Sequence, residues 1–196
     1  MKRVKHCQLP SRGSISGRSS SITNAFFNAV IPVIEPTNEE TLEVLGILGM
    51  EPSDIRCAYC GDKYTEWDHF RPIITDQKPT GYITEIANLV PSCGKCNQSK
   101  GKRNWKEWMN GPAKLSPKTR NVAKHEDRVA RLEAYETWRE ARKIDFAALV
   151  GPELWARHHR NWKGVLQSLK ESQELAAEIH AIIGIAMKNK SAGVAG

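Results

Sequence analysis

Two pairs of cysteines, each with the spacing Cys-x-x-Cys, constrain the fold of this chain more than any other feature. The first pair is Cys57 and Cys60, the second is Cys93 and Cys96, and 32 residues separate the two pairs. Each pair forms a tight turn that offers two thiolates, and four thiolates bind Zn²⁺ tetrahedrally. Four sulfur ligands leave no open coordination position. The pattern therefore predicts a structural zinc site that clamps both ends of the intervening segment together.

Other interpretations of the cysteines are weaker. Four ordinary buried cysteines do not explain two matched pairs, and a thioredoxin-like redox site requires a βαβ pattern that surrounds neither pair. The spacing also suits a metal better than the disulfides of a secreted protein. No apolar run follows the basic N-terminus, and no apolar stretch approaches the roughly twenty residues of a membrane span. We therefore expect a cytoplasmic protein with reduced thiols and no membrane partner.

The composition of each segment and the positions of proline and glycine divide the chain into four predicted parts. They are a flexible basic arm over residues 1–20, a helical support over 21–54, a core holding the cysteine pairs over 55–110, and a C-terminal helical region over 111–196. The net charge of +7 favours a polyanionic partner, although such a charge can also serve solubility alone. The arm, rich in Ser, Gly and Arg, either stays irregular or orders on phosphates.

Helical patterns flank the core on both sides. A short helix is predicted from residue 21 to about Pro32, and a capping box at Thr37 and Glu40 opens a second helix. After the core, residues 119–147 read as one amphipathic helix, and Pro152 starts another. The apolar stripe of this last helix is long enough to pack either on helix 119–147 or on a second copy of itself.

Between the cysteine pairs, the sequence predicts two strands and a helix. The stretch TEWDHF alternates as a short strand, so its neighbours Asp68 and His69 point to opposite sides. IANLVPSC is a second strand, and the residues from Cys93 to Met109 read as helical with Asn97 near the start. The predicted fold class is therefore α+β, mostly α-helical, with a small central ββα unit around a metal.

This segment resembles the HNH nuclease family, whose core is the ββα-metal finger. Asp68-His69 corresponds to the family's Asp-His pair, Asn88 to its middle asparagine, and Cys96-Asn97-x-x-Lys100 to the ending of its zinc-bearing branch. The third residue of the family's His-Asn-His motif is asparagine here, Asn97, rather than histidine. The chain is therefore an HNN variant, and this difference bears on which metal ion is preferred. The arrangement is similar to small bacterial HNH proteins, including some restriction enzymes.

The residue types fit phosphodiester hydrolysis. His69, with a reference pKa near 6.5, is the expected general base that takes a proton from the attacking water. Asp68 and Asn97 offer oxygen ligands that suit one Mg²⁺ or Mn²⁺ ion. The resemblance implies that Asn88 is a brace that hydrogen-bonds the loop backbone and fixes the His69 ring.

Basic residues near this motif are candidates for substrate binding. They are Arg71, Lys100, Lys102 and Arg103. Trp105 and Trp108 lie between basic residues, but their size and spacing favour core positions over contacts with bases. The expected partner is double-stranded DNA.

Three functions are compatible with these patterns. The first is a sequence-specific, restriction-type DNA endonuclease, in which the C-terminal helices read DNA or build a homodimer suited to palindromic sites. The second is a nicking or low-specificity HNH nuclease of phage or mobile-element origin. The third is a zinc module that binds nucleic acid without cutting it, although such a module has no need of Asp68, His69 and Asn97 together.

Overall fold

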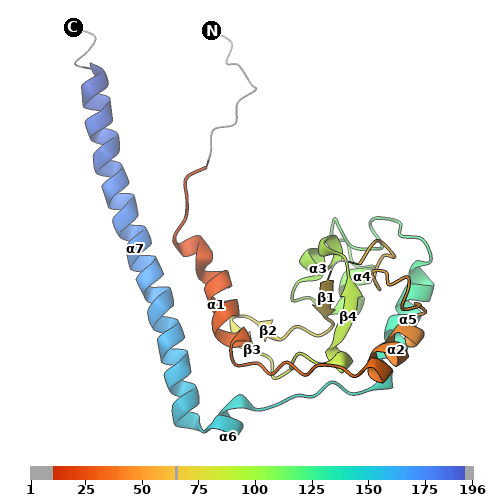
Figure 1. Cartoon of the computed structure of the whole chain (residues 1–196). Helices are drawn as coiled ribbons and strands as arrows, with labels where there is room; N and C mark the ends of the chain where they lie inside the picture. Colours follow the sequence, from red (N-terminus) through yellow and green to blue (C-terminus); the bar gives the residue numbers. More distant parts are fainter. Residues whose placement is uncertain (1–10, 65, 193–196) are drawn as a thin grey trace, which may run out of the picture. The chain divides into compact units, whose positions relative to one another are not determined.

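The computed structural model describes residues 11–64 and 66–192, with side chains described as far as Met187, and it divides into two compact units (Figure 1). One unit runs from Phe27 to Pro152 and contains the strands and all four paired cysteines. The other combines residues up to Phe26 with those from Glu153 onward. Helices dominate and the sheets are small, which confirms the α+β class.

The strands and helix of the predicted ββα unit are present. Strand β1 (Glu66–His69) pairs antiparallel with β4 (Leu89–Ser92), and helix α3 (Gly94–Lys100) follows. In Figure 1 the three elements lie together. Between the strands are the two-residue strands β2 (Ile74–Thr75) and β3 (Lys78–Pro79) and the short helix η2 (Ile86–Asn88). The alternation of β1 buries the Asp68 side chain, while His69 is half-buried.

An aromatic core supports this unit. Phe70 stacks on Trp105 with ring centroids 5.0 Å apart, and Tyr59 meets the Trp108 ring edge-on at 5.2 Å. Trp105 and Trp108 are both buried, which confirms their prediction as core residues. The Tyr135 hydroxyl donates to the carbonyl oxygens of residues 86 and 89, so the core also fixes the entrance to β4. Burial of these large rings gives the short strands a rigid base.

The flanking helices differ partly from their predicted bounds. Helix α2 (Asn38–Ile47) begins with the predicted capping box at Thr37 and Glu40. Helix α5 (His125–Trp138) is shorter than the predicted 119–147, because Lys124 lies in the left-handed region at φ 54° and Arg139 is extended. Helix α6 (Phe146–Val150) follows, capped by the Asp145 side chain.

The single helix predicted from Cys93 to Met109 is two helices. Gly101, at φ 50°, ends α3, since positive φ is easily adopted only by glycine. Asn104 then accepts hydrogen bonds from the main-chain N–H groups of Lys106 and Glu107, and so caps α4 (Trp105–Asn110). The break separates the helix that bears Asn97 from the tryptophans of the core.

The second unit consists mainly of two helices. Helix α7 (Pro152–Ala192) begins at the predicted proline, and α1 (Ser19–Asn28) ends earlier than predicted from Pro32. The Trp162 indole donates to Thr23 Oγ1 at 3.1 Å, which joins the two helices. Residues 1–10 of the predicted arm lie outside the described residues. The short helix η1 (Ser16–Arg18) and the start of α1 are ordered where irregular structure was expected, because α7 supplies hydrogen bonds to this segment.

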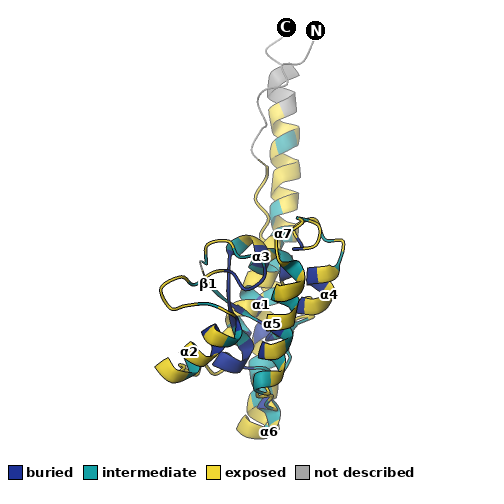
Figure 2. Ribbon diagram, turned by 90° about the vertical axis from the view of Figure 1, so that its right-hand side faces the viewer, coloured by how far each residue is buried: buried dark blue, intermediate teal, exposed yellow. Residues whose placement is uncertain are grey.

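Figure 2 shows how burial differs between elements. Most buried residues belong to the unit that holds the strands, whereas α7 is mostly exposed from Leu175 to Met187. Among the described helices, none has the length and apolar character that crossing a membrane requires.

Candidate active site and metal centre

The four paired cysteines form one cluster. Their sulfur atoms all lie within 4.8 Å of one another, and the Sγ atoms of Cys60 and Cys93 are 3.6 Å apart. Four sulfurs around a zinc ion at the usual bond length of about 2.3 Å are about 3.8 Å from each other. The predicted cluster of Cys57, Cys60, Cys93 and Cys96 is therefore present with a spacing that can hold zinc.

The protonation of the thiols also fits a metal. Hydrogen bonding with Cys60 raises the pKa of Cys57 to about 12, and the same hydrogen bond lowers the pKa of Cys60. Without a cation, such close sulfurs share protons because they cannot all ionise together. A zinc ion instead ligates all four as thiolates and releases the protons. The donor set is soft and complete, so these residues fit zinc in a structural role.

Arg120 is a partner of this cluster that sequence reasoning missed. Its guanidinium donates a hydrogen bond to Cys96 Sγ at 2.9 Å. One Zn²⁺ with four thiolates carries a net charge of −2, which the adjacent cation partly offsets. The local sequence around Arg120 gives no indication of this role, since the contact spans 24 positions and depends on the path of the loop after α4.

Asp68 lies in a buried polar cluster with Tyr59 and Lys100. Its Oδ2 accepts a hydrogen bond of 2.7 Å from the Tyr59 hydroxyl and is 3.2 Å from Lys100 Nζ. Burial raises the pKa of Asp68 and lowers the pKa of Lys100, and the ion pair between them opposes both shifts. The cluster holds the strand residue against α3, and Tyr59 was not among the predicted site residues.

The prediction that Lys100 contacts a phosphate of the substrate is wrong. Its side chain is only 1% exposed, and its ammonium donates to the carbonyl oxygens of His69 at 2.8 Å and Gly101 at 3.2 Å. Lys100 thus joins the end of α3 to the end of β1. It supports the position of the His69 main chain instead of facing DNA.

We expect Lys100→Met to destabilise the protein strongly. The substitution leaves Asp68 as an unpaired buried carboxylate and two carbonyls without a donor, a loss of about 3–5 kcal/mol in the free energy of unfolding. Thermal and urea unfolding measure it. The matched control is Lys102→Met, because Lys102 forms an exposed ion pair with Asp76 and its removal changes stability little. Equal stability of the two variants contradicts the structural role of Lys100.

His69 is held by a side chain that the sequence did not reveal. Its Nε2 lies 2.8 Å from Thr84 Oγ1, and its Nδ1 has no hydrogen-bond partner among the described residues. Thr84 is itself fixed at both main-chain groups: its N–H donates to the Pro32 carbonyl and its carbonyl accepts from the Ile34 N–H. Burial, with a smaller contribution from Lys100, lowers the pKa of His69 to about 4. The imidazole is therefore neutral near pH 7 and able to accept a proton.

Asn88 ties together the loops on either side of the strand pair. It is fully buried, and its Oδ1 accepts from the Arg71 main-chain N–H at 2.8 Å. Its Nδ2 donates to the carbonyl oxygens of Arg71 at 3.1 Å and Ile83 at 3.2 Å. Asn88 thus hydrogen-bonds the loop backbone, whereas the contact with the His69 ring comes from Thr84.

The remaining predicted residues are dispersed around this centre. Asn97 is half-buried on α3, one turn before Lys100, and the described residues make no hydrogen bond to its amide. Arg71 is mostly buried and donates to Glu136 Oε1 at 3.2 Å. Lys102 and Arg103 are exposed after the end of α3.

The arrangement described above defines a ββα-metal module. It consists of an antiparallel strand pair followed by a helix, a cluster of four cysteines, and an Asp-His pair at the end of the first strand. Residues 57–103 match the family model of the HNH endonuclease, which confirms the resemblance of this segment to that family. The chain matches no curated protein and no solved structure. The family match runs from Cys57 to Arg103 and suggests a nuclease.

Proposed function

We propose that the protein is a metal-dependent endonuclease that hydrolyses phosphodiester bonds of double-stranded DNA, with one catalytic cation in its HNH domain. The observation that carries the proposal is the His69 imidazole, which is neutral through burial, is held at Nε2 by Thr84, and lies beside Asp68 within an HNH domain. The net charge of +7 supports a polyanionic substrate.

Asp68 and Asn97 are the residues that we expect to hold the catalytic cation. The described residues engage Oδ2 of Asp68 but make no hydrogen bond to its Oδ1 or to the Asn97 amide. A carboxylate and an amide oxygen suit Mg²⁺ or Mn²⁺, in contrast to the four sulfurs that suit zinc. When bound, the cation supplies positive charge that stabilises the phosphate and the departing 3′ oxygen.

His69 performs the proton transfer in this proposal. Its Nδ1, which has no hydrogen-bond partner among the described residues, takes a proton from water. The resulting hydroxide attacks the phosphorus atom, the bond from phosphorus to the 3′ oxygen breaks, and the departing 3′ oxygen takes a proton from solvent. Thr84 keeps the ring oriented by occupying Nε2, and Asn88 fixes the loop that follows His69. Lys102 and Arg103, both exposed, are the proposed contacts to DNA phosphates. Arg71 is a weaker candidate because its side chain is mostly buried, whereas the ion pair of Lys102 with Asp76 is exposed.

We expect Thr84→Val to lower kcat roughly 10–100-fold with little change in KM, because a freely rotating His69 ring spends less time in the productive orientation. Thr84→Ser retains the hydroxyl and should restore most of kcat. Steady-state cleavage of a labelled duplex separates the two parameters. A Thr84→Val enzyme as fast as the wild type, or a Thr84→Ser enzyme as slow as Thr84→Val, contradicts the positioning role.

Sequence specificity of the restriction type is the finer part of the proposal. Most of the chain lies outside residues 57–103, and a nuclease without sequence preference needs little beyond its catalytic domain. Helices α5 and α7 are long enough to enter a major groove, which supports recognition of a defined site.

Digestion of a long linear duplex with Mg²⁺ or Mn²⁺ tests this proposal. Discrete fragments that keep their sizes as digestion proceeds support sequence-specific cleavage. A smear towards short products rejects specificity and favours the low-specificity nuclease. If duplex DNA is bound but stays intact with every divalent cation tried, the protein is a zinc-dependent binding module and the endonuclease proposal fails.

A further inference from the structure

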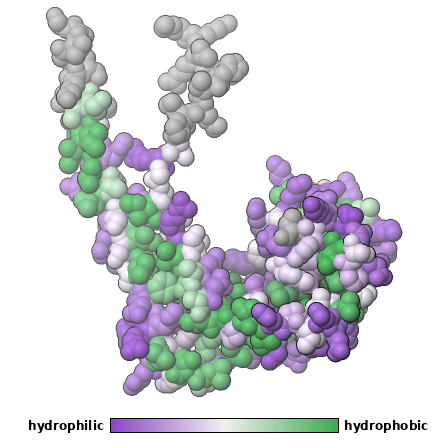
Figure 3. Space-filling view, viewed as in Figure 1, coloured by the Kyte–Doolittle hydropathy of each residue, from purple (hydrophilic) through white to green (hydrophobic). Residues whose placement is uncertain are grey.

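The later turns of α7 carry an apolar stretch, from Leu175 to Met187, in which the only charged or titratable residues are Glu178 and His180. Six large side chains in it are between 49% and 62% exposed, and they are Leu175, Ile179, Ile182, Ile183, Ile185 and Met187. Figure 3 shows apolar side chains along this helix. A helix that is apolar on most of its sides is normally buried, and exposed patches of this kind mark interaction sites.

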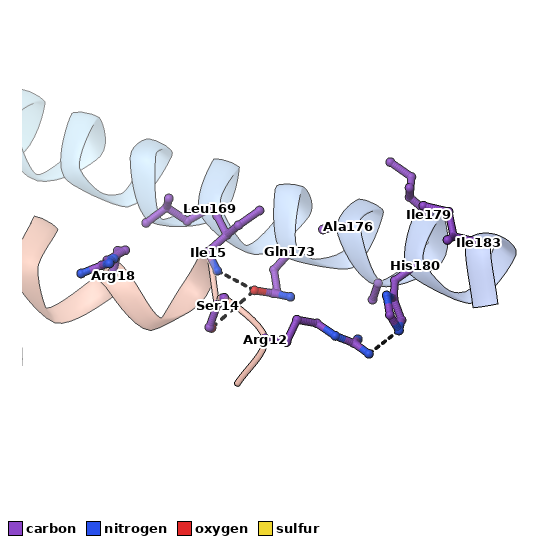
Figure 4. A pocket seen from close by; sticks show the side chains of 12 residues that line it. Arg12, Ser14, Ile15, Arg18, Leu169, Gln173, Ala176, Ile179, His180 and Ile183 are labelled. Carbon is purple, nitrogen blue, oxygen red and sulfur yellow. Dashed lines mark hydrogen bonds between the residues drawn. The ribbon is translucent and has the colours of Figure 1, made fainter. Parts of the chain in front are cut away.

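The N-terminal segment covers one side of this stretch. Gln173 Oε1 accepts a 2.8 Å hydrogen bond from the Ile15 main-chain N–H, and the Arg12 guanidinium contacts the His180 ring (Figure 4). A groove of about 710 Å³ lies along this contact, with Ile179 and Ile183 in its wall. Because successive helix residues are about 100° apart, Ile182 lies on the side opposite Gln173. The apolar surface therefore continues beyond the part that the N-terminal segment meets.

The terminal segments outside the described residues differ in composition from this apolar stretch. Residues 1–10 read MKRVKHCQLP and residues 193–196 read GVAG, which together contain few large apolar side chains and several charges. A matching apolar surface of sufficient length is, however, offered by the same stretch of another copy. A two-fold axis allows the same surface of two copies to pair. Each contact between residue i of one copy and residue j of the other is then repeated with the copies exchanged.

The charges around the stretch select the direction of such a pairing. Glu171 and Glu174 precede it, and Lys188 and Lys190 follow it. In an antiparallel pairing centred on Ala181, position 174 of one copy lies level with position 188 of the other, and the sequence has residues of opposite charge at these two positions. A parallel pairing instead brings each glutamate level with itself, and like charges at close range are unfavourable.

We propose that residues Leu175–Met187 of α7 form a two-fold, antiparallel interface with the same stretch of a second copy of this chain. If the protein is the endonuclease proposed above, the assembly carries two HNH domains, one for each strand of a duplex. The interface itself depends only on the surface of α7, so its test requires no nuclease activity.

The test is the mass of the full-length protein in solution without DNA, measured by light scattering after size exclusion. We expect twice the chain mass of 22.0 kDa for the wild type and a single chain mass for Leu175→Glu/Ile182→Glu. The matched control is Asn161→Glu/Ser168→Glu, which adds the same charges at exposed positions of α7 before the stretch and should stay dimeric. Circular dichroism checks that all variants keep their helices.

A charge exchange tests the antiparallel direction. Glu174→Lys should shift the wild-type dimer towards monomer, and Glu174→Lys/Lys188→Glu should restore the dimer. A wild-type protein of single chain mass overturns the proposal. A dimer that Leu175→Glu/Ile182→Glu leaves intact places the interface elsewhere, and failure of the double exchange to restore the dimer rejects the antiparallel pairing.

Discussion

We expect His69→Ala to lower the rate of DNA cleavage at least about 10²-fold while the fold, the zinc content and the affinity for DNA stay close to those of the wild type. General base catalysis by a positioned side chain contributes about 10²–10⁴-fold, and alanine offers no group to take the proton from water. The half-buried ring contributes little packing, and its removal leaves the Lys100 contact to the His69 carbonyl intact. Single-turnover cleavage with Mg²⁺ measures the loss, and filter binding measures affinity.

A second histidine in the same unit provides the matched control. His125 hydrogen-bonds the Met109 carbonyl through Nε2 at 3.2 Å and starts α5, away from the strand pair. His125→Ala loses one hydrogen bond of modest strength, so its cleavage rate should stay near that of the wild type. If His69→Ala still cuts at a comparable rate, or if both variants lose activity equally, His69 is not the general base.

We expect Cys93→Ser to lose zinc and to unfold the ββα unit. Cys93 is buried, lies directly before α3, and belongs to a sulfur cluster in the hydrophobic core of the unit. Structural zinc contributes roughly 10–16 kcal/mol to the folding of small zinc-finger peptides at neutral pH, so the loss of one ligand removes a large share of stability. Zinc content by elemental analysis and thermal unfolding by circular dichroism measure the two effects.

The remaining cysteine serves as the control for this substitution. Cys7 lies outside both Cys-x-x-Cys pairs and outside the described residues, so Cys7→Ser should keep one zinc ion per chain. Chelation of the metal from the wild type should reproduce the unfolding seen with Cys93→Ser. A Cys93→Ser protein that is folded, active and free of zinc refutes the structural role of the cluster.

Sequence reasoning succeeded where function depends on short spacings. Two cysteines at Cys-x-x-Cys spacing must point towards a common centre, and the two pairs therefore predicted the cluster that the structure contains. Alternation along TEWDHF predicted the strand and the opposite directions of Asp68 and His69. The match to the HNH endonuclease family over residues 57–103 confirmed the resemblance drawn from the same positions.

The support of the site depends on contacts between distant positions, and these were not predictable. Thr84 reaches His69 across 15 positions, Lys100 reaches the His69 carbonyl across 31, and Arg120 reaches Cys96 across 24. Thr84 and Arg120 have no local pattern that distinguishes them from surface residues, and the motif that contains Lys100 does not reveal which atoms its side chain contacts. Lys100 in particular read as a phosphate contact because lysine is usually exposed, and only its burial against Asp68 reveals a structural role.

The predicted bounds of the helix over 119–147 were wrong because they too depend on contacts with distant residues. Amphipathic spacing over 119–147 predicted one helix, but the chain leaves the helical region at Lys124 and again at Arg139. Arg139 forms ion pairs with Glu40 and Glu43 of α2. Contacts with another element therefore accompany the end of α5, and periodicity within the segment carries no information about them.

The most direct test of the account is incubation of the purified protein with supercoiled plasmid DNA in Mg²⁺, in Mn²⁺ and in EDTA, beside His69→Ala in the same buffers. We predict open-circular or linear DNA with a divalent cation, and intact supercoiled DNA with EDTA or with the variant. Cleavage that persists in EDTA contradicts the metal-dependent mechanism. Supercoiled DNA that stays intact under every condition contradicts the proposal that this HNH domain cuts DNA.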